Sequence, residues 1–214
     1  TRRATDKRIP LEPLPYPLPP KGEFALARMG YESAQIERIE RLLSAPSGIV
    51  LFVGPTGSGK TTSMFECLQE IARRRPECRQ VTVEDPVEYP MPWAVQLGVS
   101  DARNEEETGD AFLDRVRVML RMAPHIILLG EIRGAEVATA ALNAAITGHL
   151  AISTMHVNDP FLFVDRLEIM DRDRLHRGVF CDPKIIRGVI AQRLIPHLCP
   201  DCSVRPGDSL PARI

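Results

Sequence analysis

A glycine-rich segment, LFVGPTGSGKTT, contains the clearest chemical motif in the sequence. Gly54, Gly59, Lys60 and Thr61 fit the pattern G-x-x-x-x-G-K-[S/T], which holds nucleotide phosphates. Glycines let backbone N–H groups turn toward phosphate oxygens at the start of a helix, where the helix dipole also favours anions. The lysine would reach the β- and γ-phosphates, and the Thr61 hydroxyl would bind Mg²⁺. A glycine-rich turn that fits by chance is the alternative, and the strand expected before the motif and the helix expected after it argue against this.

Acidic residues follow two other apolar runs. IILLGEIRG supplies Glu131 at the expected metal side of the site, where Asp is the commoner residue. VTVEDPVEYP supplies Glu84, Asp85 and Glu88, after a strand that Pro86 would end. Open α/β sheets bind ligands at the carboxyl ends of their strands, so a carboxylate there could orient or deprotonate the water that attacks the γ-phosphate. An ordinary strand-end acid and a solvated acidic turn are the respective alternatives.

Two histidines, His149 and His156, stand seven positions apart in AITGHLAISTMHVND, with no cysteine or further metal-type ligand close by. A neutral imidazole donates one hydrogen bond and accepts another, so it could link a phosphate or a water to a neighbouring element. From the residues alone, the favoured interpretation is structural: two histidines whose hydrogen bonds are satisfied at the ends of a strand.

The hydrophobic pattern alternates between short apolar runs and amphipathic segments. Strands are expected at GIVLFV, QVTVE, AVQLGV, HIILLGEI and HLAISTM, and helices at YESAQIERIERLL, residues 60–74, residues 109–122, AEVATAALNAAI, PFLFVDRLEIM and PKIIRGVIAQRL. Continuous apolar strands that alternate with helices predict an α/β fold, with a mostly parallel sheet covered by helices on both faces.

Composition narrows the functional classes. Lys and Arg number 27 against 28 Asp and Glu, and aromatic residues make up 5%, so neither a basic surface nor many stacking platforms for nucleic acid are expected. No apolar run reaches the roughly 18 residues of a membrane span, and no secretory signal is found. Five cysteines, an odd number with one close pair, favour a reducing compartment over a disulfide framework.

The two ends of the chain differ from its middle. Residues 1–22 are basic and then proline-rich, as in an extended linker, whereas residues 23–198 carry the alternating pattern of one nucleotide-binding domain. Residues 199–214 begin with CPDC. Because the chain does not begin with Met and stops soon after this pair, we expect it to be a piece of a longer protein.

Together these motifs resemble those of the secretion ATPase superfamily, the hexameric motors of type II secretion, type IV pilus assembly and related type IV secretion systems. GPTGSGKTT is similar to the family's Walker A motif, TVEDPVEY to its Asp box, LLGEIRG to its Walker B motif, TGHLAISTMHVND to its His box, and AQRLIPHLCPDC to the approach to its zinc motif. The resemblance extends from about Phe24 to Cys202 and implies a RecA-like P-loop NTPase fold. Gly134, where the family usually has Asp, is a departure that spares the catalytic positions.

The resemblance also implies roles for individual residues. Glu88 matches the catalytic glutamate that polarises water, and Glu131 matches the Walker B residue on the Mg²⁺ side, with Thr61. His149 and His156 match the two His-box positions, which lie near the nucleotide and sense its state. The whole phosphate loop would contact the nucleotide: Gly54, Pro55, Thr56, Gly57, Ser58, Gly59, Lys60, Thr61 and Thr62.

Two arginines, Arg133 and Arg166, match positions whose charges can cross to the phosphates of a neighbouring subunit in a ring. The pair Cys199 and Cys202 supplies half of a tetrahedral zinc site, and the other three cysteines form no second pair. In the assembly and secretion branches of the family a second Cys-x-x-Cys follows, so zinc is expected only in a longer parent protein. In this chain the pair is expected to be two reduced thiols.

The expected cofactors are therefore ATP and Mg²⁺. The resemblance implies a hexameric ring of copies of the chain, an inner-membrane platform protein as partner, and a cytoplasmic location at the inner membrane through that partner. A RecA-like DNA translocase or plasmid-transfer ATPase is the alternative, although it would require a basic surface for nucleic acid, which is not expected here. A scaffold that binds nucleotide without hydrolysing it is a third hypothesis. The presence of Lys60, Glu88 and Glu131, which hydrolysis would use, argues against it.

Overall fold

The computed structural model describes residues 24–99 and 105–196, except for the side chains of residues 105–110. Within these residues, six strands form one sheet in the order β3-β2-β4-β5-β1-β6, and every pairing is parallel. The strands are β1 (Gly48–Val53), β2 (Gln80–Glu84), β3 (Ala94–Gly98), β4 (Ile126–Glu131), β5 (Leu150–Met155) and β6 (Ile186–Ala191). The predicted α/β fold with a mostly parallel sheet is confirmed.

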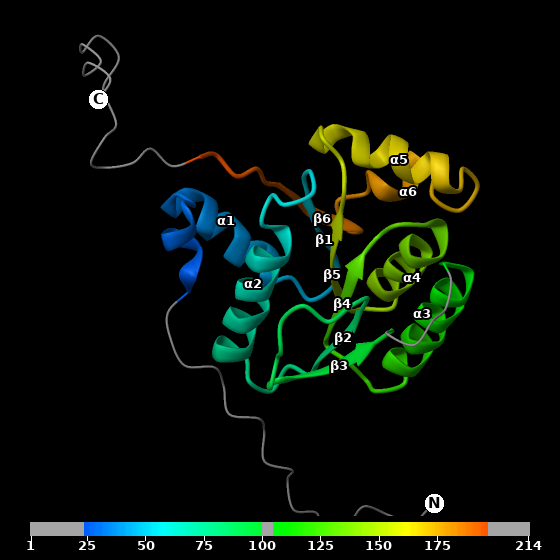
Figure 1. Cartoon of the computed structure of the whole chain (residues 1–214), viewed down its shortest axis with the longest axis horizontal. Coiled ribbons are helices and arrows are strands. Elements are labelled where there is room, and N and C mark those ends of the chain that lie inside the picture. Colours follow the sequence, from blue (N-terminus) through cyan, green and yellow to red (C-terminus); the bar gives the residue numbers. More distant parts are fainter. Residues whose placement is uncertain (1–23, 100–104, 197–214) are drawn as a thin grey trace, which may run out of the picture.

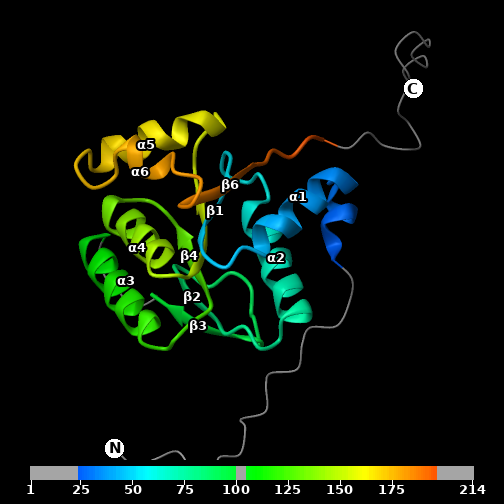
Figure 2. The same cartoon turned by 180° about the vertical axis from the view of Figure 1, so that it is seen from behind.

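Helices cover both faces of this sheet (Figures 1 and 2). On one face lie α1 (Ser33–Leu43) and α2 (Lys60–Arg74), and on the other lie α3 (Glu105–Leu120) and α4 (Ala135–Ile146). The short η1 (Ala25–Met29) adjoins α1, whereas η2 (Pro160–Leu162), α5 (Phe163–Met170) and α6 (Arg177–Phe180) lie between β5 and β6 in the chain. In the part of the chain that the structure describes, no helix combines the length and apolar character needed to cross a bilayer.

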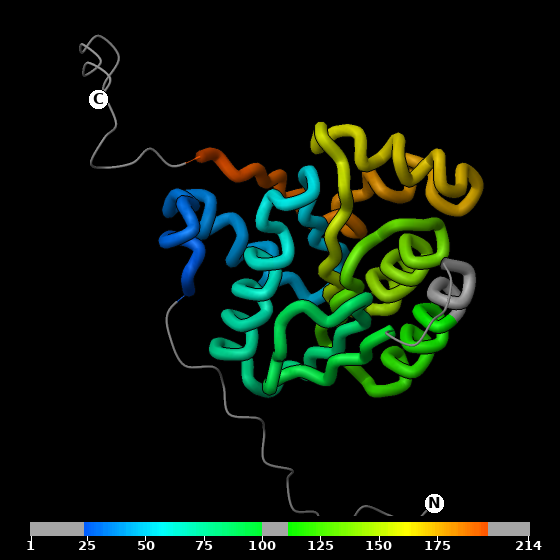
Figure 3. Tube along the Cα trace, in the orientation of Figure 1, coloured from blue at the N-terminus to red at the C-terminus, as the bar shows by residue number. Residues whose placement is uncertain are grey.

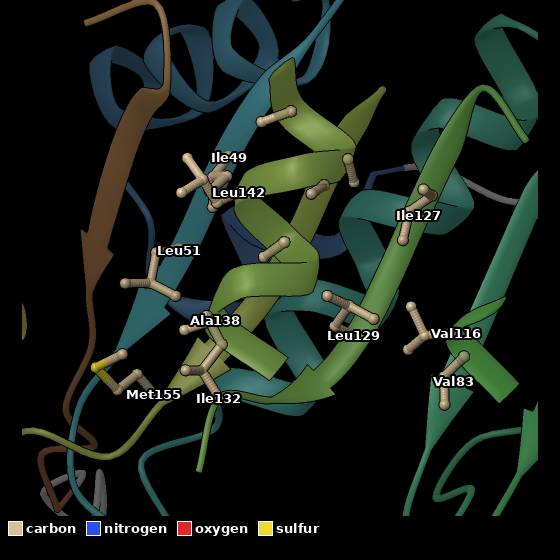
Figure 4. Packing of buried hydrophobic residues seen from close by; sticks show 14 of the residues in the cluster. Ile49, Leu51, Val83, Val116, Ile127, Leu129, Ile132, Ala138, Leu142 and Met155 are labelled. Atoms are coloured by element: carbon tan, nitrogen blue, oxygen red, sulfur yellow. The ribbon is translucent and has the colours of Figure 1, made fainter. Parts of the chain in front are cut away.

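The central strand β1 shows why both faces are covered. Its side chains alternate between two hydrophobic clusters: Ile49 and Leu51 pack against α4, and Val50 and Phe52 pack on the side of α1 and α2. Each of these residues is at most 1% exposed. Successive side chains of a strand point to opposite faces, so an entirely apolar strand requires burial on both. Figure 4 shows the first cluster, in which Leu129 of β4 takes part.

One predicted helix is wrong. In PKIIRGVIAQRL, residues Ile186–Ala191 form β6, which pairs in parallel with the edge of β1. Ile186, Val189 and Ile190 are spaced as on a helix face, but a short apolar run of this kind fits a strand equally well. Pairing decides between the two, because β6 satisfies backbone N–H and C=O groups that β1 would otherwise leave open at the sheet edge. The predicted helix PFLFVDRLEIM begins as η2 and continues as α5.

The direction of the strands has a consequence for function. Because all of them run in parallel, the residues that follow β1, β2, β4 and β5 meet at the same edge of the sheet. These are the segments that carry the phosphate loop, the Asp box, Glu131 and His156. The fold therefore brings together side chains that lie up to about a hundred residues apart.

Replacing Leu129 by alanine tests the packing of this sheet. Leu129 is fully buried in the cluster of Figure 4, so we expect Leu129→Ala to lower the free energy of unfolding by about 2–5 kcal/mol in urea denaturation. Leu162→Ala is the matched control because Leu162 is 48% exposed, and its loss should stay within about 0.5 kcal/mol. Equal losses for the two variants would contradict the described core.

Candidate nucleotide-binding site

A cavity of about 1030 Å³ opens at the carboxyl edge of the sheet. Its wall combines the phosphate loop with segments that follow β2, β4 and β5. The lining includes Thr56, Gly57, Ser58, Gly59, Lys60, Thr61, Thr62, Glu84, Asp85, Glu88, Glu131, Arg133 and His156. A volume of this size is at the upper end of the range for small-molecule sites.

The phosphate loop between β1 and α2 adopts a backbone conformation that favours glycine. The φ angles of Gly54, Gly57 and Gly59 are +154°, +71° and +80°, a region that residues with a Cβ rarely adopt. Gly59 is the N-cap of α2, so the first N–H groups of that helix face the loop without intrahelical partners. The loop thus presents backbone donors to an anion.

The segment after β6 packs across this loop (Figure 3). The Gln192 backbone N–H donates to the carbonyl of Val53 at 2.9 Å, and a Cβ built on Gly54 would lie 2.3 Å from the carbonyl oxygen of Gln192. The Gln192 side chain accepts a hydrogen bond from the Tyr31 hydroxyl at 2.9 Å. Sequence reasoning missed both residues, because no local motif marks a contact made across more than a hundred residues.

Lys60 is the cation at the centre of the site. Its Nζ donates to the carbonyls of Gly54 and Pro55, at 3.0 and 2.8 Å, and lies 3.4 Å from Nδ1 of His156. Burial lowers the pKa of the ammonium, and the negative charge of Glu131 acts in the opposite direction. Charged phosphate oxygens are stronger acceptors than carbonyls, so the phosphates of a nucleotide could replace the two carbonyls as acceptors for the Lys60 ammonium.

A bulge in β4 directs Glu131 into the cavity. Leu129 pairs with Ser153 but Glu131 pairs with Thr154, so the register shifts at Gly130. Bulges next to active sites commonly re-aim a side chain in this way. The hydrophobic pattern of the sequence does not predict this shift in register.

The Glu131 carboxylate joins a line of charged and polar groups. Its Oε1 lies 3.3 Å from Nε2 of His156, and its Oε2 accepts a hydrogen bond from Nε of Arg133 at 2.7 Å. Arg133 also approaches the Asp85 carboxylate, at 3.8 Å. These contacts form a chain of five side chains along the wall of the cavity, in the order Lys60, His156, Glu131, Arg133 and Asp85.

The two histidines are separated by the whole length of β5. His156 follows the carboxyl end of the strand and lines the cavity, with Nδ1 3.3 Å from the Thr56 hydroxyl. His149 precedes the amino end, roughly 20 Å away at the rise of a strand, where Nδ1 lies 3.1 Å from both the Ala144 carbonyl and the Thr147 hydroxyl. His149 therefore does not line the cavity that His156 lines, and its part in sensing the nucleotide stays a prediction. Its contacts agree with the structural interpretation.

The carboxylates after β2 differ in their surroundings. Glu84 is 4% exposed, and its Oε1 accepts hydrogen bonds from the Thr82 hydroxyl at 2.6 Å and from Nε2 of Gln96 at 3.0 Å. Glu88 is exposed and lines the cavity. A buried carboxylate with its hydrogen bonds already made is suited to support, whereas an accessible one can meet a water molecule.

The remaining predicted residues lie nearby or outside the described ranges. Arg166, on α5, lines a neighbouring groove together with Pro55, Thr56 and Arg133. Cys199 and Cys202 fall outside the described residues. Among residues that the structure describes, no group of three or more His, Cys, Asp or Glu side chains is arranged to hold a metal ion.

A model of the family described as type II/IV secretion system protein matches residues 19–212. The chain belongs to this family. It is 38% identical over 176 residues to the type IV pilus assembly ATPase PilB of Thermus thermophilus. This match covers 82% of this chain and 18% of PilB. It is 36% identical over 177 residues to the type II secretion system ATPase E of Vibrio cholerae, covering 83% of this chain and 33% of the relative. The chain thus spans between about a fifth and a third of the length of these relatives.

Two solved structures of ATPases have the same fold as this chain. The pilus retraction motor PilT with bound ADP superimposes with a TM-score of 0.66 at 30% identity, covering 82% of this chain and 49% of PilT. The Legionella pneumophila ATPase DotB gives a TM-score of 0.64 at 33% identity, covering 83% of this chain and 47% of DotB. The predicted relationship to the secretion and pilus ATPases and their P-loop fold is confirmed.

The close approach of Gly54 to Gln192 yields a test of the loop geometry. Gly54→Ala introduces a Cβ that the carbonyl of Gln192 excludes, so the loop must move. Such backbone strain costs about 1–3 kcal/mol, and we expect ATP affinity measured by calorimetry to fall about tenfold or more. Gly98→Ala is the control, because a Cβ there meets only ordinary contact, 3.7 Å from Val87. Unchanged affinity in Gly54→Ala would show that this loop does not hold the phosphates.

Proposed function

We propose that the chain is the ATP-hydrolysing motor domain of a secretion or type IV pilus assembly ATPase. The observation that carries this proposal is the convergence of the phosphate loop, Glu131 and Glu88 on one cavity at the carboxyl edge of the sheet. Membership of the family and the ATPase names of its relatives support it. An anion cradle, a buried cation and an accessible carboxylate are the groups that phosphoryl transfer to water requires.

Each group has a proposed part in hydrolysis. The N–H groups of the loop and the Lys60 ammonium bind the β- and γ-phosphates, which replace the loop carbonyls as partners of Nζ. Thr61 and Glu131 line the same cavity and offer the hard oxygen ligands that Mg²⁺ prefers. When bound, the metal ion would neutralise phosphate charge. Glu88 orients the attacking water and accepts its proton.

His156 is proposed to report the state of the nucleotide. Its ring lies between the Lys60 ammonium and the Glu131 carboxylate, which are the groups closest to the expected γ-phosphate. Loss of that phosphate removes a partner from Lys60, and the hydrogen bonds of the ring must then rearrange. The effect can pass to β5, whose carboxyl end the histidine follows.

The chain is proposed to work in a hexameric ring at the cytoplasmic face of the inner membrane, on a platform protein there. Arg133 and Arg166 lie along the groove beside the cavity, together with Leu162 and Ile169, which are 48% and 85% exposed. Apolar side chains exposed next to arginines suit coverage by a neighbouring subunit. Nucleic acid is not among the proposed partners.

Single substitutions separate binding from turnover. Lys60→Ala should weaken ATP binding itself, because it removes a positive charge from the bound phosphates. Glu88→Gln should leave ATP and Mg²⁺ binding nearly unchanged while turnover falls by about 10²–10⁴-fold, the scale for losing a general base. Glu131→Gln should weaken Mg²⁺ binding and slow hydrolysis together. Calorimetry and phosphate release measure the two quantities.

Glu84→Gln is the control for these variants. A glutamine retains the oxygen that accepts from Thr82 and Gln96, so turnover should change little. If Glu84→Gln abolishes turnover with binding intact and Glu88→Gln does not, the roles of the two carboxylates are assigned wrongly. Turnover in wild-type protein that does not exceed that of Lys60→Ala would reject the proposed activity.

A further inference from the structure

The side chain of Gln96, on β3, ties together both ends of the loop that carries Glu88. We propose that Gln96 is a positioning residue for hydrolysis: its amide fixes this loop so that the Glu88 carboxylate faces the attacking water. The inference rests on the proposed role of Glu88, and it adds a residue that no motif in the sequence marks.

The Gln96 amide makes hydrogen bonds on both sides of the loop. Its Nε2 donates to Glu84 Oε1, at 3.0 Å, and to the carbonyl of Tyr89, at 2.9 Å. Its Oε1 accepts from the backbone N–H of Met91, at 2.7 Å. A glutamine amide has two donor hydrogens and an acceptor oxygen, and here both sides of the amide are used. Glu84 precedes the loop, and Tyr89 and Met91 follow it.

The anchor at the first end is firm. Glu84 is buried, and the Thr82 hydroxyl donates to the same oxygen as Gln96 does. Thr82 pairs with Gln96 in the parallel register of β2 and β3, so the side chains of Thr82, Glu84 and Gln96 lie on one face of the sheet. Burial of Glu84 keeps water from competing for these hydrogen bonds.

The second end of the loop is joined to the phosphate-loop helix. The Tyr89 hydroxyl lies 3.2 Å from that of Thr62, and the Tyr89 ring packs on Phe65 with centroids 4.9 Å apart. Trp93 packs on Phe65 as well, at 5.5 Å. The loop is therefore held between the sheet and α2, and Gln96 is the side chain that joins these two attachments.

This arrangement bears on catalysis because Glu88 is exposed and its position follows from that of the loop backbone. A general base acts only within hydrogen-bond reach of the proton it abstracts. Displacement of a reacting group by about 1 Å can cost about a hundredfold in rate. Loosening both ends of the loop should therefore slow turnover without removing any group that binds the nucleotide.

The experiment compares Gln96→Leu and Gln96→Glu with wild type in the full 214-residue chain. Leucine removes all three hydrogen bonds. Glutamate keeps the size of the side chain and the acceptor for Met91, but it loses the donors and faces the Glu84 carboxylate. Val95→Thr is the matched control, because Val95 is the neighbouring residue on β3 and is 43% exposed.

Three quantities are measured: ATP affinity, turnover, and acrylamide quenching of Trp93, the single tryptophan of the chain, which lies between the loop and β3. We expect both Gln96 variants to lower kcat by about 10- to 100-fold, to keep ATP affinity within about twofold, and to increase quenching. Val95→Thr should match wild type in all three quantities.

The outcomes separate this inference from the proposed function. Wild-type kcat in both Gln96 variants overturns the positioning role and leaves the proposed activity intact. Parallel losses of ATP affinity and turnover in both Gln96 variants would also overturn it, since Gln96 would then only stabilise the fold. If wild type shows no turnover above Lys60→Ala, the proposed activity fails. If, in that case, Trp93 quenching is also unchanged in both Gln96 variants, the proposal that Gln96 fixes the Glu88 loop is rejected as well.

Discussion

The sheet is buried on both faces, and this burial determines where charged side chains can lie. Strands such as β1 and β4 are covered by helices on each side, so they leave no place for a charged side chain along most of their length. Charged side chains lie instead at the ends of the strands, which the helices do not cover. Because the strands are parallel, these ends lie together. The site is therefore a consequence of how the core is buried as much as of the motifs themselves.

At that edge, opposite charges lie close together in a form that a nucleotide can rearrange. Lys60 is held by carbonyls of its own loop, and Glu131 is held by Arg133 and faces His156. In the proposed function, a phosphate group would offer Lys60 a charged acceptor, and a metal ion would offer Glu131 a stronger partner than an arginine that is 65% exposed. Binding would thus exchange existing contacts for stronger ones. Such an exchange is a means by which nucleotide state can alter the conformation of the segments that follow β4 and β5.

The sequence predicted those parts of the site whose signal is local. The phosphate loop is a contiguous pattern, and the strands before it and before Glu131 are unbroken apolar runs. The segment of β6 was misassigned because its apolar spacing fits a helix and a strand alike, and only its pairing with β1 settles the matter. The separation of His149 from His156 could not be predicted from the resemblance, which supplies identities, whereas a six-residue strand between the two histidines puts them at opposite ends. Gln96 and Gln192 could not be found from sequence, since their roles depend on contacts with distant segments.

The proposed function requires that one edge of the sheet holds ATP, with Glu88 as the residue that activates water. A crystal structure of the chain with Mg²⁺ and a non-hydrolysable ATP analogue would show both. We expect Lys60 Nζ to leave the carbonyls of Gly54 and Pro55 for the phosphates. We also expect the Glu88 carboxylate to lie within about 2.6–3.2 Å of the water opposite the γ-phosphate, directly or through one further water. A nucleotide bound elsewhere, or a γ-phosphate whose in-line water is held by Glu84 or Glu131 with Glu88 turned away, would contradict it.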